Sequence, residues 1–429
     1  MVIKKPIKSI RIVILLGAPF TAQNFERVGI PYLSKHFEVM VFDCTKWLRR
    51  NTENIKYQRA HWNNYLVINS EKDLAVQIEK YLPHYAIDFI GFGNYTLSIC
   101  QILAKNDVKF VIQKTGSLPK IKISLRIKKI LRALIFRENT LGMVVDYEKT
   151  TVLSDKTIAI KRIDKLFGLI KLKLQQLLII KKLNTLPNYI GLIAGYKSLD
   201  RFTRRSDPII WIGSNDYHTF NKVKKELVLN KSHQAVEPFI LFIDDNLPGA
   251  HDWTLLGISA PVTEALYYPA LNTFFEKIES IYDMPVRIAA HPNSDADEDY
   301  VRKMGVRHVI YGNTAMLTLQ SSLVLMHAST AVSFAVMARK PIIFLTTQEL
   351  DQSHYGLNVM TMSESLGSPL VFMDVNNTKE IELKKIFIDE CKYSLYEANY
   401  LHNEHSNEIE PWGALIGFIN TSSQMAEHA

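Results

Sequence analysis

Two adjacent carboxylates are the first residues whose types suggest proton chemistry. Asp244 and Asp245 follow the apolar segment Phe239–Ile243, which is expected to form a buried strand. A carboxylate at such a strand end can take a proton from an acceptor hydroxyl and act as a general base. Asp and Asn are also frequent in turns, and Asn246 follows the pair, so an ordinary turn is the alternative.

A histidine stands at the end of the next expected strand. His291 follows Val286–Ala290 and precedes Pro292, which ends strand pairing and fixes the turn. A His held in this way could bind a phosphate or donate a proton to a leaving group. The alternative is a His that only satisfies backbone groups at the strand end.

Two hydroxyl residues follow a third expected strand, Leu323–Met326. Ser329 and Thr330 stand where a helix is expected to begin, and their hydroxyls can cap that helix. Hydroxyls and free N–H groups at a helix start can equally hold a phosphate, which the helix dipole favours.

A glycine-containing turn follows the expected strand His308–Tyr311. Gly312 and Asn313 allow the backbone to approach a ligand, and Thr314 can cap the next helix. These three residues could hold a nucleobase or a ribose. An ordinary strand-to-helix turn is the alternative.

The turn after the first expected strand leads to Glu26 and Arg27, on a helix expected over Asn24–Lys35. Both residues are candidates for acceptor binding, and a surface ion pair is the alternative. Neither GxGxxG nor GxxxxGK[ST] follows this strand, which argues against a dinucleotide oxidoreductase and a P-loop NTPase. No third carboxylate stands at ligand spacing from Asp244 and Asp245, so no metal site is predicted.

Alternating strands and helices must position these residues. Apolar segments separated by helical stretches run along both halves of the chain, which predicts parallel sheets with helices on both faces. We therefore predict an α/β fold of two doubly wound, Rossmann-like domains that face a cleft, where ligands of such folds bind. The predicted domains are 1–235, with an insertion at 114–186, and 236–405, followed by a tail at 406–429.

Composition excludes several classes of protein. The 429 residues are 47% hydrophobic and 22% charged, which is typical of a folded rather than a disordered chain. Three widely spaced cysteines give no disulfide framework and fit a reducing cytosol. No apolar run reaches the roughly 18–20 residues that a membrane span needs. The basic start mimics a secretory signal, but we interpret Ile10–Leu16 as the first buried strand.

Positive charge is concentrated in one segment. Residues 114–186 hold 17 Lys and Arg against five Asp and Glu, whereas the whole chain has a net charge of +8. Apolar residues recur at helical spacing over 119–137 and 161–182, with basic residues between them. This pattern predicts two basic amphipathic helices on an anionic membrane surface, and surface helices that cover the core are the alternative. Few aromatic residues in the segment 114–186 could stack bases, so nucleic acid is not expected as a partner.

Several of these motifs together resemble a known group of enzymes. The combination consists of the strand with His291-Pro292, then YGNTA (311–315), then HAST (327–330) with a helix and KPIIF (340–344). It looks like the donor half of bacterial surface-polysaccharide glycosyltransferases of the GT-B type. In particular, they resemble sialyl-, polysialyl- and Kdo transferases, which use CMP-activated ulosonic acids. The resemblance is clear over about residues 290–345.

The resemblance implies roles for the donor-side residues. By position, His291 with Pro292 and Ser329 with Thr330 would bind the phosphate of CMP. His291 would also assist the departure of that phosphate.

The resemblance also implies a base near the acceptor hydroxyl. Asp244 and Asp245 are the nearest match to the acidic motif of this group, although Asn246 stands where that motif has glycine. Glu26 or Asp216 could serve as the base instead.

The implied protein is a metal-independent glycosyltransferase of capsule or lipopolysaccharide synthesis that needs no cofactor. Residues 236–405 would bind a CMP-sugar donor, and residues 1–235 would bind a glycan or lipid-linked acceptor. It would work in the cytoplasm, bound peripherally to the inner face of the cytoplasmic membrane. The alternatives are a transferase that uses an NDP-sugar, a nucleotide-sugar epimerase, a polyol-phosphate transferase and a non-catalytic GT-B scaffold of a polysaccharide assembly complex.

Overall fold

A computed structural model of the chain describes most of its residues. The described residues are 10–49, 59–93, 95–121, 125, 177–200, 202–229, 237–292, 294, 298–305, 307–375, 386–406 and 410–427.

The first sheet has seven strands in the order β3-β2-β1-β4-β5-β6-β7, and every neighbouring pair is parallel. The first six strands follow the order of a dinucleotide-binding, doubly wound sheet. The strands are β1 (Arg11–Leu16), β2 (Glu38–Asp43), β3 (Tyr65–Val67), β4 (Tyr85–Phe89), β5 (Lys109–Lys114), β6 (Tyr189–Ala194) and β7 (Ser206–Ile212).

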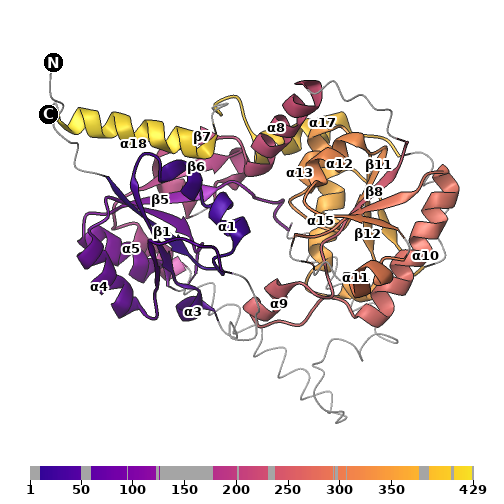
Figure 1. Cartoon of the computed structure of the whole chain (residues 1–429), viewed down its shortest axis with the longest axis horizontal. Helices are drawn as coiled ribbons and strands as arrows, with labels where there is room; N and C mark the ends of the chain where they lie inside the picture. Colours follow the sequence, from indigo (N-terminus) through magenta and orange to yellow (C-terminus); the bar gives the residue numbers. More distant parts are fainter. Residues whose placement is uncertain are drawn as a thin grey trace, which may run out of the picture.

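The second sheet repeats that order with six parallel strands, β10-β9-β8-β11-β12-β13. Its strands are β8 (Ile240–Ile243), β9 (Val286–Ala289), β10 (His308–Ile310), β11 (Leu323–Met326), β12 (Ile342–Thr346) and β13 (Leu370–Phe372). The two sheets lie in separate halves of the molecule (Figure 1). The predicted fold class, α/β with two doubly wound, Rossmann-like domains, is confirmed.

Helices cover the faces of both sheets (Figure 1). In the first half and the segment after it they are α1 (Ala22–Arg27), α2 (Ile30–Leu33), α3 (Thr45–Leu48), α4 (Glu71–Tyr81), α5 (Thr96–Lys105) and α8 (Asn215–Leu229). In the second half they are α9 (His251–Leu256), α10 (Glu264–Tyr282), α11 (Glu298–Lys303), α12 (Thr314–Gln320), α13 (Val332–Met337), α14 (Gln348–Gln352), α15 (Gly356–Leu366) and α17 (Glu390–Tyr396). The last helix, α18 (Pro411–Glu427), packs on the first half. A π-helical turn, η4 (Glu397–Leu401), follows α17.

The central strand β1 explains why the first sheet is buried on both faces. Successive side chains of a strand point to opposite faces. Ile12 and Ile14 accordingly belong to one hydrophobic cluster, and Val13 and Leu15 belong to another. All four side chains are fully buried, as expected for a parallel sheet between two layers of helices.

The single helix predicted over Asn24–Lys35 is wrong, because the structure divides it into α1 and α2. Gly29 lies between them with a φ of 78°, in the left-handed region that favours glycine. A Cβ at this position would lie 2.3 Å from the indole ring of Trp412, so the close approach of that ring also requires glycine.

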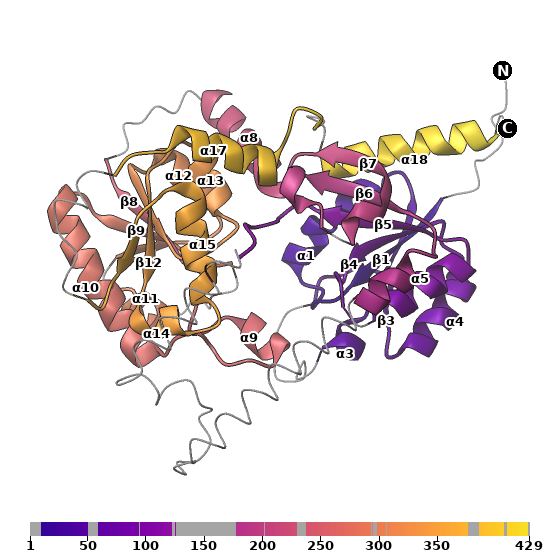
Figure 2. The ribbon, with the colours of Figure 1, turned by 180° about the vertical axis from the view of Figure 1, so that it is seen from behind.

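The chain crosses between the two halves at α8 and again before α18. α8 falls within the predicted first domain but packs on α12 and α13, where Phe220 contacts Ala315 and Phe334. α18 lies within the predicted tail and returns to the first half, where Leu415 and Ile419 are fully buried in its core (Figure 2).

The basic segment 114–186 is described only at its ends. Residues 122–124 and 126–176, which include most of the two predicted amphipathic helices, lie outside the described residues. Within the described part of the chain, no helix combines the length and the apolar character that crossing a membrane requires.

Candidate functional site

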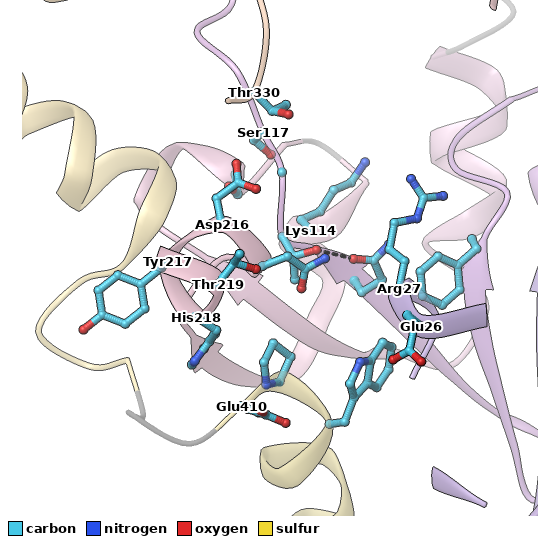
Figure 3. Close-up of a pocket in the computed structure, with 18 of the residues that line it drawn as sticks. Glu26, Arg27, Lys114, Ser117, Asp216, Tyr217, His218, Thr219, Thr330 and Glu410 are labelled. Atoms are coloured by element: carbon cyan, nitrogen blue, oxygen red, sulfur yellow. Dashed lines mark hydrogen bonds between the residues drawn. The ribbon is translucent and has the colours of Figure 1, made fainter. Parts of the chain in front are cut away.

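A cavity of about 1670 Å³ lies where the carboxyl ends of the first sheet face the second half. Its walls come from α1 and α2, the segments that end β4 and β5, the loop after β6, α8, the start of α18 and Thr330 from the loop after β11. Figure 3 shows Asp216, Ser117 and Thr330 together at one end of this cavity, with Glu26 and Glu410 toward the other. The cavity therefore joins residues of both halves.

The helix after β1 brings Glu26 and Arg27 to the cavity wall, where the sequence analysis expected them to face a ligand. They form the last two residues of α1, which Thr21 caps by accepting a hydrogen bond from the Asn24 N–H at 3.3 Å. The same wall contains Tyr32, which is hydrogen-bonded to Glu410.

Two charged residues at strand ends, Asp88 and Lys114, line the cavity. The Oδ1 atom of Asp88, the second-last residue of β4, accepts hydrogen bonds from the N–H groups of Ile90 at 2.9 Å and Gly91 at 3.2 Å. Burial raises the pKa of Asp88, while these bonds and the charge of Lys114 act in the opposite direction. Lys114 is the last residue of β5. Neither residue was a candidate from the sequence, because Asp88 stands inside an apolar strand segment and Lys114 is the first residue of the basic segment 114–186.

The first turn of α8 holds Asp216 at the boundary between the halves. Ser214, just before α8, accepts a hydrogen bond from the Tyr217 N–H at 3.1 Å, and its own N–H donates to the Leu401 carbonyl at 2.7 Å. Asp216 is hydrogen-bonded to the side chain of Ser333 in α13, and burial raises the pKa of Asp216 to about 6. At neutral pH this carboxyl is mostly ionised and has a basicity suited to proton transfer.

His218 follows on the same turn and was not selected from the sequence. It lines the cavity, and its Nε2 atom is buried without a hydrogen-bond partner among the described residues. Burial lowers the pKa of His218, so its neutral form is favoured. Nothing in the local sequence distinguishes it from an ordinary helical histidine.

The acidic pair after β8 is buried rather than presented to the cavity. Asp244 is 3% exposed, and its Oδ2 accepts a hydrogen bond from the Tyr300 hydroxyl at 2.7 Å. Its Oδ1 accepts from the Asn246 N–H at 3.0 Å, which is the turn geometry that the alternative interpretation expected. Burial raises the pKa of Asp244 to about 6.

Asp245 connects the loop after β8 to the loop after β11. It is 9% exposed, and its Oδ2 accepts a hydrogen bond from the Ala328 N–H at 3.0 Å. Burial raises the pKa of Asp245 to about 7, and the charge of Asp244 adds to that increase.

Tyr355 holds the other backbone polar group of Ala328, its carbonyl. Its hydroxyl donates to the Ala328 carbonyl at 2.5 Å and lies 3.4 Å from Asp245 Oδ2. The Trp253 ring of α9 contacts the Tyr355 ring edge-on, with 5.7 Å between centroids. Ala328, the residue just before Ser329 and Thr330, is thus fixed through both its N–H and its carbonyl.

The Ser329–Thr330 turn is only partly used as a helix cap. Ser329 Oγ accepts a hydrogen bond from the Ala331 N–H at 3.3 Å. Ala331 is the N-cap residue of α13, and α13 has no side-chain cap hydrogen bond from this residue. Thr330 is exposed and lines the cavity. Its side chain therefore faces the cavity.

The remaining donor-side residues lie on neighbouring loops of the second sheet and not on the cavity wall. His291 is half-buried after β9, and its carbonyl accepts from the Ser294 N–H at 2.9 Å; Pro292 is exposed. Gly312 and Asn313, after β10, are exposed, and no atom lies within 4 Å of a Cβ added at Gly312. Thr314 is the first residue of α12, so the expectation that it caps this helix is wrong.

The first residue of the HAST segment has a structural role. His327 is fully buried between the Tyr267 hydroxyl, 2.8 Å from Nε2, and the Leu345 carbonyl, 2.7 Å from Nδ1. Burial lowers the pKa of His327 to about 4, which keeps the ring neutral. In the part of the chain that the structure describes, no group of three or more His, Cys, Asp or Glu side chains is placed to hold a metal ion.

Comparison with known proteins gives structural neighbours but no family. No protein-family model and no curated protein matches the sequence. Among solved structures, UDP-GlcNAc 2-epimerase from Methanocaldococcus jannaschii is similar at a TM-score of 0.45 and 11% identity, over 96% of this chain and 100% of that one. The wall teichoic acid polymerase TagF is similar at 0.48 and 11%, over 99% and 91%.

A third neighbour is the spinosyn forosaminyltransferase SpnP, at a TM-score of 0.42 and 11% identity, over 97% of this chain and 100% of that one. At scores and identities this low, the likenesses carry no argument about the reaction. The fold assignment accordingly rests on the two sheets themselves.

Proposed function

We propose that the protein is a nucleotide-sugar-dependent glycosyltransferase of surface-polysaccharide synthesis. One observation carries this proposal: Thr330, from the expected phosphate-binding turn, and Asp216, a carboxyl with a pKa near 6, line the same cavity between the two halves. Sugar transfer needs this combination, because the donor phosphate and the acceptor hydroxyl must be held side by side.

In the proposed reaction, the acceptor hydroxyl attacks the anomeric carbon of the donor sugar. The new carbon–oxygen bond forms as the bond between that carbon and the phosphate oxygen breaks, and the electron pair leaves with the nucleotide. Asp216 takes the acceptor proton, and Glu26 lines the same cavity as the second candidate base. His291 would donate a proton to the departing phosphate.

The buried acids have a different role in this proposal. Asp245 and Tyr355 hold the Ala328 peptide and so orient Ser329 and Thr330 toward the phosphate. Gly312 and Asn313, exposed on the adjacent loop, would contact the nucleoside.

Two donor classes share this phosphate chemistry. An NDP-sugar presents two phosphates, whereas a CMP-ulosonic acid, the donor implied by the sequence resemblance, presents one phosphate and one sugar carboxylate. A nucleotide panel tests both: the stability of the native state should rise with ligand concentration for the nucleotide that it binds. Selective stabilisation by CMP favours the ulosonic acid donor, and selective stabilisation by UDP, CDP or GDP favours an NDP-sugar. No stabilisation by any nucleotide contradicts the proposed function and favours the scaffold alternative.

The membrane association and cytoplasmic location expected from the sequence stay part of this proposal. Lys122, Arg126 and Lys129 belong to the first predicted amphipathic helix, outside the described residues. Reversing these three charges should release the protein from anionic liposomes, since each basic residue near such a surface contributes about 1 kcal/mol. Unchanged liposome binding by the variant would contradict membrane docking through this segment.

A further inference from the structure

We propose that Lys114 and the turn Thr115–Ser117 form a subsite for the second anionic group of the donor, beyond the phosphate next to the nucleoside. This inference rests on the proposed function. The second group is another phosphate in an NDP-sugar and a carboxylate in a CMP-ulosonic acid. In both cases its oxygens accept charge-assisted hydrogen bonds from an ammonium group and from backbone N–H groups.

The position of Lys114 in the sheet supports this assignment. It is the last residue of β5, which lies between β4 and β6 within the first sheet. Ligands of doubly wound sheets bind outside the carboxyl ends of the strands, and Lys114 lines the cavity at that edge. Figure 3 shows Lys114, Ser117 and Thr330 around the same part of the cavity.

The charges around Lys114 leave its ammonium group available. Among the described residues, no carboxylate lies at ion-pair distance from it. The carboxylate that interacts with it electrostatically, Asp88, is already hydrogen-bonded to the N–H groups of Ile90 and Gly91. Asp216, another carboxyl of the cavity wall, is hydrogen-bonded to Ser333. Asp88 offsets part of the charge of Lys114, but without a direct ion-pair partner among the described residues the half-buried ammonium group can bind an anionic ligand.

The turn after Lys114 is fixed at both ends and open in the middle. Thr115 is buried, its carbonyl accepts from the Asn215 N–H at 3.3 Å, and Leu118 packs against the core of the second half. Gly116 is exposed, and no atom lies within 4 Å of a Cβ added there. An anion can therefore approach the backbone at Gly116 without displacing a side chain.

The arrangement divides the donor between the two halves. The first phosphate would lie at Ser329 and Thr330, and the second anion would lie across the cavity at Lys114. Because Lys is a compact point charge rather than a planar fork, it can neutralise either a phosphate or a carboxylate. The subsite should thus strengthen binding of the whole donor without changing the affinity for a nucleoside monophosphate.

The test compares Lys114→Met with a matched control on the same strand. Lys109 is the first residue of β5, at the opposite edge of the sheet, where its ammonium group lies 5.5 Å from the centre of the Tyr85 ring. Calorimetric titration of wild type, Lys114→Met and Lys109→Met would use CMP, UMP, CDP, UDP and CMP-sialic acid. Thermal melting without ligand checks that both variants fold.

We expect Lys114→Met to bind the monophosphates like wild type and to bind either the diphosphates or CMP-sialic acid about tenfold more weakly or worse. Loss confined to CDP or UDP identifies the second group as a phosphate, and loss confined to CMP-sialic acid identifies it as a carboxylate. Lys109→Met should bind every ligand like wild type. Equal weakening of mono- and diphosphate binding, or no weakening, overturns the subsite while leaving the proposed function intact. A wild-type protein that binds none of these nucleotides overturns the proposed function itself.

Discussion

The two sheets have the same strand order but present different groups at their carboxyl ends. At the first sheet, the charged residues Glu26, Asp88 and Lys114 line the cavity. At the second sheet, the carboxylates of Asp244 and Asp245 are buried and bonded to protein groups.

The difference indicates how one fold can be used for two tasks. Buried carboxylates in the second half hold the backbone at Asn246 and Ala328, and Gly312, Asn313 and Thr330 are exposed on loops of the same sheet. Ionisable groups in the first half and on α8 stay in the cavity, where they can exchange protons or bind charge. We therefore assign donor holding to the second half and proton transfer to the opposite wall.

The largest expected effect on the rate of sugar transfer comes from removing the proposed base, Asp216. Asp216→Asn keeps the shape of the side chain but cannot accept a proton at neutral pH. We expect the rate of sugar transfer to fall about 10²–10⁴-fold, while the affinity for nucleotide changes little. Steady-state kinetics with a separate nucleotide titration measures both quantities.

Asp245→Asn is the corresponding variant of the second sheet. Its main effect should be on donor affinity, because Asp245 contacts the Ala328 N–H rather than the cavity. The comparison between the halves is wrong if Asp245→Asn abolishes transfer at unchanged donor affinity while Asp216→Asn transfers sugar normally.

A smaller effect should follow from loosening the turn before Ser329. Tyr355→Phe removes the hydroxyl that donates to the Ala328 carbonyl, and one such hydrogen bond contributes about 1 kcal/mol. We expect the Kd for donor to rise about fivefold with kcat nearly unchanged. Saturation kinetics and nucleotide titration separate the two.

The second half contains a matched control for this substitution. The Tyr393 hydroxyl also donates to a backbone carbonyl, that of Lys340 at 2.9 Å, but Lys340 lies at the amino end of β12, away from the proposed donor loops. Tyr393→Phe should leave the donor Kd unchanged. Equal changes in both variants would mean that Tyr355 acts through general stability rather than through the turn.

The sequence predicted most of the sheet framework, because parallel strands are short apolar runs and their positions are easily recognised. The predicted strand Leu323–Met326 agrees with β11 at both ends, and the predicted strand Ile10–Leu16 differs from β1 by one residue. Gly29 and Pro31 signal the break between α1 and α2 in the sequence, whereas the packing of Trp412 on Gly29 could not be predicted, since Trp412 lies far away along the chain.

The site was predicted less completely, for a physical reason. Motif residues such as Thr330 and Glu26 were recognisable by type and spacing, and both line the cavity. Lys114 lies at the end of an apolar strand, and His218 lies within a helix. Whether these side chains line the cavity depends on the tertiary fold and not on the local sequence. The burial of Asp244 and Asp245 likewise results from Tyr300 and Ala328, which are distant in sequence.

The smallest expected effect concerns how stability depends on pH. Burial raises the pKa of Asp245 to about 7, whereas an unfolded chain would have a value of about 3.9. Between these values the folded state binds more protons than the unfolded state, so the contribution of Asp245 to stability falls as pH rises through that range. Asp245→Asn cannot ionise, and the melting temperature of this variant relative to wild type should therefore rise by a few degrees between pH 5 and pH 8.

Asp299→Asn is the control, because the pKa of Asp299 is shifted in the opposite direction to that of Asp245. Hydrogen bonds and ion pairs with Lys303 and Arg302 lower the pKa of the exposed Asp299 carboxyl. Its contribution is present above the unfolded pKa and is lost only in stronger acid, so the difference between this variant and wild type should stay constant from pH 5 to pH 8. A flat difference for Asp245→Asn as well would mean that Asp245 is ionised in the folded protein. Its carboxylate would then be a charged group like those of the first sheet, and the contrast between the two carboxyl edges would disappear.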